Sequence, residues 1–208
     1  MPKKRKSKWR WVILGIPISL IVIGLSVIGI FGWDLVKQTA LLSKTVLVPY
    51  EPDKEARTFD HETWPTLPSP GDKLGDLTIA SVDLSYPVVQ GTQKKELKQG
   101  IGHFAGSVLP GQGGNVLLSA HRETHFAKLE NLKQGDIITF STPYGEFKYE
   151  TVDFKIVSAD DETVAVPTDY ETLTLTTCYP FDFIGDAPDR FVVYTKFLSV
   201  TETAAATE

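Results

Sequence analysis

The stretch "LTLTTCYPF", Leu173–Phe181, alternates apolar and polar residues and holds the only cysteine of the chain. Such alternation, rich in threonine, is typical of a half-buried β-strand. Leu173 and Leu175 then face one side of the strand, while Thr176 and Cys178 face the other side. The pattern therefore predicts a thiol that points away from the leucine face at the end of a strand, where a loop opens.

Other segments on both sides of this strand have the same texture of short apolar runs broken by Gly, Pro and Asp. The predicted strands are two within 73–91, one at 114–120, a hairpin of 136–142 and 146–158 across "TPYG", and a last strand at 190–197 after the 172–177 strand. A change of side-chain parity near 150–152 predicts a β-bulge. Only 94–104 and 124–135 resemble short helices. The predicted fold is all-β: a single barrel over residues 71–199 with a few short helices.

The N-terminal region differs sharply from this barrel. Residues 1–10 carry six basic residues and no acidic one, and residues 11–33 carry no charge at all. A helix over 11–33 would be roughly 35 Å long, enough to cross a bilayer. We predict a transmembrane anchor at 11–33, with 1–10 kept in the cytoplasm by its basic residues. The alternative is a cleaved signal peptide, but the apolar run exceeds the usual ~7–15 residues and no small-residue cleavage site follows.

Three further segments complete the predicted organisation. Residues 34–70 lack a sustained period and gather prolines toward their end, which predicts a stalk, and 200–208 read as a disordered tail. The predicted anchor places the 71–199 domain outside the cell. All 26 acidic residues lie after residue 33. This acidic body argues against nucleic acid as a partner, because duplex binding needs a basic face.

An exported protein with one unpaired cysteine has either a buried structural thiol or a reactive one. Only the thiolate is nucleophilic, so a reactive Cys178 needs a base and a cation nearby. His121 directly follows the strand 114–120, so it also lies at a strand end. His103 and His125 are equally well explained as structural histidines.

Two arginines, Arg122 and Arg190, lie within the predicted barrel. Arg190 opens the last strand, so a hairpin of the last two strands would bring it opposite Cys178. A guanidinium there could hold an oxyanion with two N–H donors. The alternative is a surface ion pair with Asp186 or Asp189.

The segment "HRETH", residues 121–125, also allows a test for a metal site. Two histidines four residues apart can bind zinc on a helix. Here the preceding segment is a predicted strand, and no third ligand is evident. We therefore expect neither a metal nor a cofactor.

Together these features resemble the sortase family. "TLTTC" matches the family's Thr-Leu-x-Thr-Cys motif at Thr174, Leu175, Thr177 and Cys178. Two further segments resemble the class D branch: the "YPFDF" that follows the motif, and residues 102–126, "GHFAGSVLPGQGGNVLLSAHRETHF". The resemblance implies a membrane-anchored, extracellular cysteine transpeptidase of the Gram-positive cell surface.

By this resemblance, Cys178 attacks after the Thr of an LPxTG-like sorting signal and forms a thioacyl-enzyme. His121 serves as general acid and then base, Arg190 stabilises the oxyanion, and Thr177 contacts the substrate. The partners would be secreted proteins carrying the signal and the amine of a peptidoglycan precursor. Two other classes stay open: a membrane-tethered cysteine protease, in which water completes the reaction, and a non-catalytic wall-binding module.

Overall fold

The computed structural model describes residues 16, 18–22, 24–26, 64–182, 185 and 187–202, which belong to two units treated separately below. In the first unit the described residues are helical, and their large apolar side chains, such as Ile16, Leu20 and Leu25, are more than half exposed. No helix among the described residues is long and apolar enough to span a membrane. The other residues of the predicted anchor, the 1–10 segment and 34–63 lie outside the described residues.

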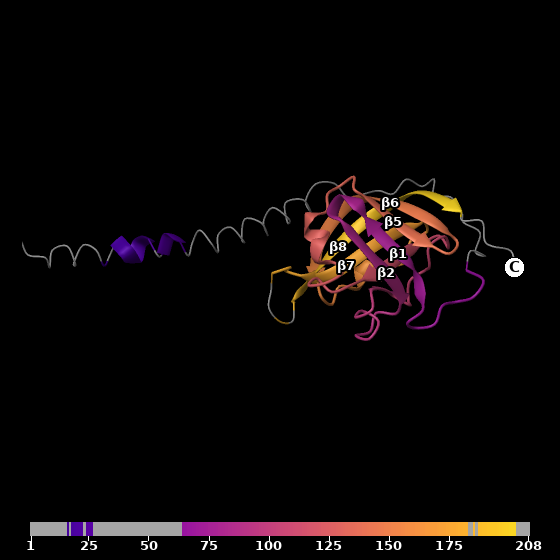
Figure 1. Ribbon diagram of the computed structural model, residues 1–208, viewed down its shortest axis with the longest axis horizontal. Coiled ribbons are helices and arrows are strands. Elements are labelled where there is room, and N and C mark those ends of the chain that lie inside the picture. The colour runs from indigo at the N-terminus through magenta and orange to yellow at the C-terminus, as the bar shows by residue number, and fades with distance from the viewer. Residues whose placement is uncertain are drawn as a thin grey trace, which may run out of the picture. The chain divides into compact units, whose positions relative to one another are not determined.

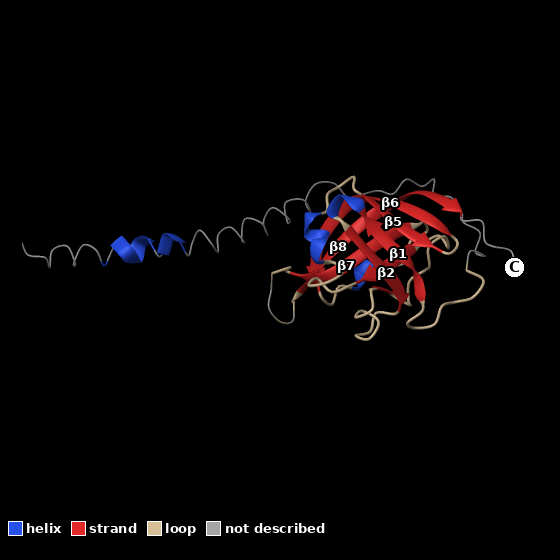
Figure 2. Ribbon diagram, in the orientation of Figure 1, coloured by secondary structure: helices blue, strands red, loops and turns tan. Residues whose placement is uncertain are grey.

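The second unit is a closed barrel of eight strands, visible in Figures 1 and 2 as a curved wall of arrows. The strands are β1 (Lys73–Ile79), β2 (Leu84–Gln90), β3 (Ile101–His103), β4 (Asn115–Ser119), β5 (Ile137–Thr142), β6 (Gly145–Ser158), β7 (Thr172–Tyr179) and β8 (Asp189–Glu202). Around the barrel they follow the order β1-β2-β3-β4-β7-β8-β6-β5. The β2–β3 and β4–β7 pairs are parallel and the others antiparallel. The predicted all-β barrel is confirmed.

The apolar side chains of the alternating strands fill the inside of this barrel. Leu77, Leu118, Phe140, Leu175 and Val193 come from five different strands and are all fully buried. The predicted hairpin is formed by β5 and β6, and the register between β6 and β8 shifts between Thr151 and Asp153. The bulge expected near residues 150–152 is therefore confirmed.

The helix expected over 94–104 is wrong. Residues 94–99 form turns, and β3 occupies Ile101–His103. A Cβ on Gly102 would meet the Gly91 carbonyl oxygen at 2.5 Å, so β3 lies where only glycine permits the neighbouring chain to approach. Residues 94–104 resembled a short helix in the sequence, but this close packing of backbone decides the local structure.

Three short 3-10 helices interrupt the connections: η2 (Ala80–Val82), η3 (Ala127–Asn131) and η4 (Glu162–Ala165). The helix expected over 124–135 is reduced to η3. At the two limits of the domain in the sequence, Trp64 of the predicted stalk donates from Nε1 to the Pro110 carbonyl at 2.9 Å, and β8 extends to Glu202, into the predicted tail. Residues 203–208 lie outside the described residues.

A buried carboxylate organises the end of the barrel where β7 begins. Glu171 is 3% exposed and accepts hydrogen bonds from the Tyr149 hydroxyl at 2.8 Å, from Gly111 N at 3.1 Å and from Gly113 N at 3.0 Å. Burial raises the pKa of Glu171 to about 7, although these three donors oppose the shift. The same burial, together with the Glu171 charge, raises the pKa of Tyr149 well above its ordinary value.

Glu171→Gln should therefore change how stability depends on pH. A carboxyl group whose pKa is raised on folding stabilises the protein most below its unfolded-state pKa near 4.5 and loses that contribution as pH rises through about 7. The shift corresponds to about 3 kcal/mol of unfolding free energy lost across this window. Urea unfolding at pH 5, 6, 7 and 8 should show a smaller decline in the Glu171→Gln variant than in the wild type. Glu146→Gln, at an exposed ion pair, is the control, and an unchanged decline in Glu171→Gln would contradict the assignment.

Candidate active site

Cys178 and Arg190 lie directly opposite each other on neighbouring antiparallel strands. The β7–β8 register pairs Cys178 with Arg190 and Thr177 with Phe191. Thr177 and Phe191 are buried inside the barrel, whereas Cys178 and Arg190 are half-buried and face outward. The predicted placement of both residues at the outer face of the hairpin is confirmed by this register.

His121 is brought to the same place from the other side of β7. The parallel register of β4 and β7 pairs Ser119 with Thr176, and Ala120 N donates to the Thr176 carbonyl at 3.3 Å. His121 is the next residue along the chain, so it follows the end of β4 beside the part of β7 that leads to Cys178. The three predicted catalytic residues thus come from the adjacent ends of β4, β7 and β8, although they lie far apart in the sequence.

Thr177 has a structural contact of its own. It is 2% exposed, and its hydroxyl donates to the Ala120 carbonyl at 2.7 Å. This bond ties β7 to the residue immediately before His121. The substrate contact inferred for Thr177 stays a prediction, while the geometry favours the alternative of a threonine that holds two strand ends together.

The guanidinium of Arg190 is held by the backbone of its own connection. Its Nη1 donates to the Ala187 carbonyl at 3.2 Å and to the Asp189 carbonyl at 2.9 Å. Among the described residues no carboxylate lies within ion-pair distance of Arg190, and Asp186 lies outside them. The Arg190 side chain is thereby oriented at the mouth of the β7–β8 hairpin without being neutralised by Asp189.

The turn that follows His121 is compact and carries a second histidine. Phe126 N and Thr124 N both donate to the His121 carbonyl, at 3.1 and 3.3 Å. The His125 ring packs edge-on against Tyr86, with 4.8 Å between centroids. Burial, and then the charge of His121, lower the pKa of His125. His125 is therefore close enough to His121 to sense its charge, but it is occupied by an aromatic contact.

His103 is a structural histidine. It is 1% exposed, and its ring nitrogens lie 2.7 Å from Gln90 Oε1 and 2.9 Å from the Val108 carbonyl. Desolvation lowers the pKa of His103. These contacts confirm the structural alternative for this histidine and leave no role for it beside Cys178.

The sequence pointed less clearly to Arg122, the residue after His121. Arg122 is 4% exposed, and its Nη2 donates to the Gly185 carbonyl at 2.9 Å. Arg122 is buried although it lies in a turn. This is unusual, since arginine is rarely buried without a partner. In the sequence, only its position next to His121 indicated that Arg122 could belong to this site.

The outer face that carries Cys178 continues into a hollow of about 320 Å³ beside η4. Val164 of η4 packs on Leu117 and Val192 of the sheet, forming a small apolar cluster outside the barrel. Thr174 lines the hollow, and it lies four residues before Cys178 on the same face, or about 13 Å along β7. An extended peptide of about four residues can span this distance.

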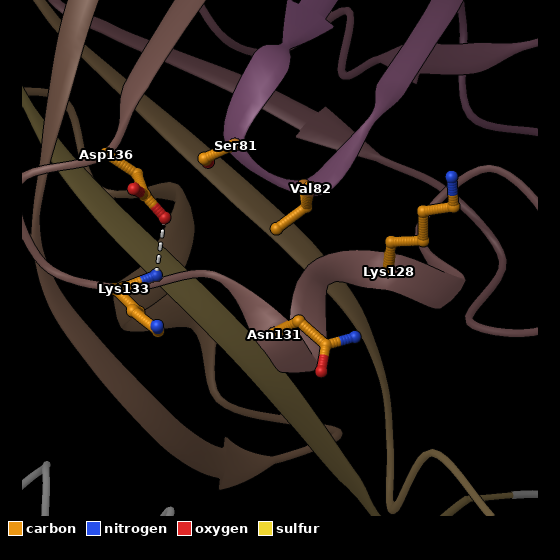
Figure 3. Close-up of a pocket in the computed structure, with 6 residues that line it drawn as sticks. All are labelled: Ser81, Val82, Lys128, Asn131, Lys133 and Asp136. Carbon is orange, nitrogen blue, oxygen red and sulfur yellow. Dashed lines mark hydrogen bonds between the residues drawn. The ribbon is translucent and has the colours of Figure 1, made fainter.

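A second hollow, of about 460 Å³, lies between η2 and η3. Figure 3 shows Ser81 and Val82 on one side of it and Asn131 and Lys133 on the other. It is larger than the hollow beside η4, but none of the predicted site residues lines it.

No group of three or more His, Cys, Asp or Glu side chains is arranged to hold a metal ion among the described residues. "HRETH" forms a turn that leads into η3, not the helix on which two histidines four residues apart share a face. The adjacent ends of β4, β7 and β8 carry or lead to an imidazole, a thiol and a guanidinium. Such a set can perform acyl transfer through a thioester.

Comparison with known proteins gives a consistent result. A family model described as a sortase domain matches residues 77–198. The chain is 34% identical to Sortase D of Bacillus subtilis (strain 168) over 191 residues, which covers 87% of this chain and 96% of that protein. The barrel is similar to the solved structure of a Clostridium perfringens Sortase D5 transpeptidase, with 26% identity, a TM-score of 0.59 and coverage of 64% and 83% of the two chains.

A second solved structure, Clostridium perfringens sortase C with the C-terminal cell wall sorting motif, is 28% identical with a TM-score of 0.58. The similarity covers 63% of this chain and 73% of that one.

Proposed function

The chain belongs to the sortase family of transpeptidases, with class D members among its relatives, and on that premise we propose that it is a membrane-anchored, extracellular cysteine enzyme. It cleaves an LPxTG-like sorting signal after Thr and transfers the protein to an amine of the cell wall. The observation that supports the proposal is the adjacency of three strand ends: Cys178 on β7 pairs with Arg190 on β8, and the end of β4 that leads to His121 pairs with β7.

In the first half-reaction the thiolate of Cys178 attacks the carbonyl carbon of the signal's Thr. Negative charge develops on the carbonyl oxygen, and the N–H groups of Arg190 stabilise it. His121 donates a proton to the leaving amine, the C–N bond breaks, and a thioester remains on Cys178. In the second half-reaction an incoming amine attacks this thioester, His121 accepts its proton, and the Cys178 thiolate is released.

The hollow beside η4 supports this assignment of the substrate. A Leu-Pro-x-Thr segment with its Thr carbonyl at Cys178 would extend about 10 Å to its Leu. Such a segment, laid along the outer face of β7, ends near η4 and the hollow lined by Thr174 and Val166. Val166 is 54% exposed there and could contact an apolar side chain. The similar sortase C determined with a sorting motif supports the same substrate class.

The N-terminal region supports the membrane assignment. Residues 11–33 are uncharged and follow six basic residues, and the described helical residues within them expose Ile16, Leu20 and Leu25. A helix with apolar side chains turned outward suits a lipid environment. Anchoring by 11–33, with 34–70 as a stalk, would raise the effective concentration of secreted substrates held at the same membrane.

Thioester formation is the direct test of this function. Incubation with Leu-Pro-x-Thr peptides ending in Gly or Ala should add the mass of the acyl fragment to the protein, and hydroxylamine should remove it. Cys178→Ala should give no adduct and no turnover yet keep the barrel, because the side chain faces outward. Added amine should convert the thioester into the amide product. Release only to water would indicate the protease instead, and a folded wild type that forms no adduct with either peptide would indicate a binding module.

His121 and His125 should separate in a paired substitution. His121→Ala removes the proposed general acid and should lower turnover by ~10²–10⁴-fold. His125→Ala removes an edge contact to Tyr86 and should leave activity within about tenfold, since that histidine is one turn away from the aligned strand ends. Steady-state kinetics of both folded variants provides the measurement. The opposite ranking of the two variants would transfer the acid–base role to His125.

Arg190→Lys tests whether the guanidinium fork is required. A point charge cannot reproduce planar two-donor recognition, so Lys and Ala should both lower kcat/KM by on the order of 100- to 1000-fold. This loss corresponds to ~2.7–4 kcal/mol of transition-state stabilisation. The melting temperature should change little, because Arg190 is half-buried and its hydrogen bonds within the described part of the chain go to the backbone of Ala187 and Asp189. Near-normal kcat/KM in a folded Arg190→Lys protein would exclude the oxyanion role.

A further inference from the structure

Arg122 is a buried cation with defined partners. It is 4% exposed, its Nε lies 2.9 Å from Glu123 Oε1, and its Nη2 donates to the Gly185 carbonyl at 2.9 Å. Burying a guanidinium is costly unless charged and polar groups replace the water that it loses. Glu123 is largely exposed, so solvent weakens that ion pair. The distinctive contact is the one to Gly185, which is 63 residues away in the chain.

This contact joins the two segments that carry the proposed acid–base and nucleophilic groups. Arg122 follows His121 at the end of β4, and Gly185 belongs to the connection between β7 and β8, which links Cys178 to Arg190. Arg190 donates to the Ala187 carbonyl in the same connection. Two guanidinium groups therefore bind carbonyls that lie two residues apart: Arg122, next to His121, binds Gly185, and Arg190 of β8 binds Ala187.

The residues on both sides of His121, Ala120 and Arg122, are hydrogen-bonded to β7 or to the connection that follows it. On the preceding side, Ala120 donates to the Thr176 carbonyl and accepts from the Thr177 hydroxyl. On the following side, Arg122 binds Gly185. The regular β4–β7 ladder ends at Ser119 and Thr176, so these contacts continue its alignment beyond the strands.

We propose that Arg122 is a positioning residue: by binding the Gly185 carbonyl it holds His121 beside the end of β7 that carries Cys178. This inference rests on the proposed transpeptidase function. It assigns Arg122 no contact with the substrate and no share in oxyanion binding. Its effect should be confined to the alignment of reacting groups, since a small displacement of a catalytic group can lower a rate by ~100-fold.

The test uses the full-length protein in detergent and compares Arg122→Gln, Arg122→Lys and Glu123→Gln. Single-turnover acylation by a Leu-Pro-x-Thr peptide should fall by ~10- to 100-fold in Arg122→Gln, through the maximal rate and not through the peptide concentration at half-maximal rate. Arg122→Lys keeps a donor and should recover part of the rate. Glu123→Gln, the matched control, should stay within about twofold of the wild type because its ion pair is exposed.

A second readout is independent of turnover. Amide hydrogen exchange of peptides covering 180–188 should be faster in Arg122→Gln, while exchange of the barrel strands is unchanged. Lowered stability with unchanged acylation and unchanged exchange of 180–188 would mean that Arg122 only stabilises the fold, and it overturns the proposal. So does an equal loss of acylation in Glu123→Gln, which would assign the effect to the ion pair.

Gly185→Ala provides the test if Arg122→Gln does not fold. Gly185 has a φ of +107°, where a Cβ is strained, so this substitution should shift the carbonyl that Arg122 binds. Acylation should fall in Gly185→Ala, and adding Arg122→Lys should lower it no further, because both changes weaken one contact. Independent, additive losses overturn the proposal. Wild-type protein that forms no thioester refutes the transpeptidase function itself, whereas active wild type with unaffected variants refutes only the role of Arg122.

Discussion

The parallel pairing of β4 with β7 is the constraint on which the site depends. Neighbouring parallel strands end at the same edge of a sheet, so the residues that follow them meet there. Ser119 pairs with Thr176, so His121 and Cys178 each follow this last pair by two residues. A slip of one residue would turn Cys178 toward the barrel interior and Thr177 outward. The buried Leu173, Leu175 and Thr177 oppose such a slip, since each would be transferred to the outer face.

Beyond the strands, hydrogen bonds to single carbonyl groups take over from the ladder. The Thr177 hydroxyl binds Ala120, Arg122 binds Gly185, and Arg190 binds Ala187 and Asp189. Except at Asp189, which begins β8, each of these bonds uses a side chain to satisfy a backbone carbonyl outside the strands. The candidate site thus lies at strand ends, and the backbone that follows these ends is held by the side chains of Thr177, Arg122 and Arg190.

The buried carboxylate of Glu171 and the proposed nucleophile Cys178 lie at opposite ends of one strand. β7 begins beside Glu171, a buried carboxylate that ties Gly111 and Gly113 to Tyr149, and it ends at Cys178 and Tyr179. The carboxylate lies among backbone donors and a hydroxyl, with its pKa raised by burial to about 7. Cys178, the proposed nucleophile, is instead half-buried and faces outward.

The sequence by itself determined the strand alternation, the position of Cys178 at a strand end and on the outward face, and the hairpin of the last two strands that brings Arg190 opposite it. These features depend on side-chain period and turn residues, which are local. The sequence did not determine β3, where Gly102 allows a close approach of two chains and residues 94–104 resembled a short helix. Nor did it determine the contact of Arg122 with Gly185 or the burial of Glu171. Both arise from segments distant in the chain, and only the closed barrel brings those segments together.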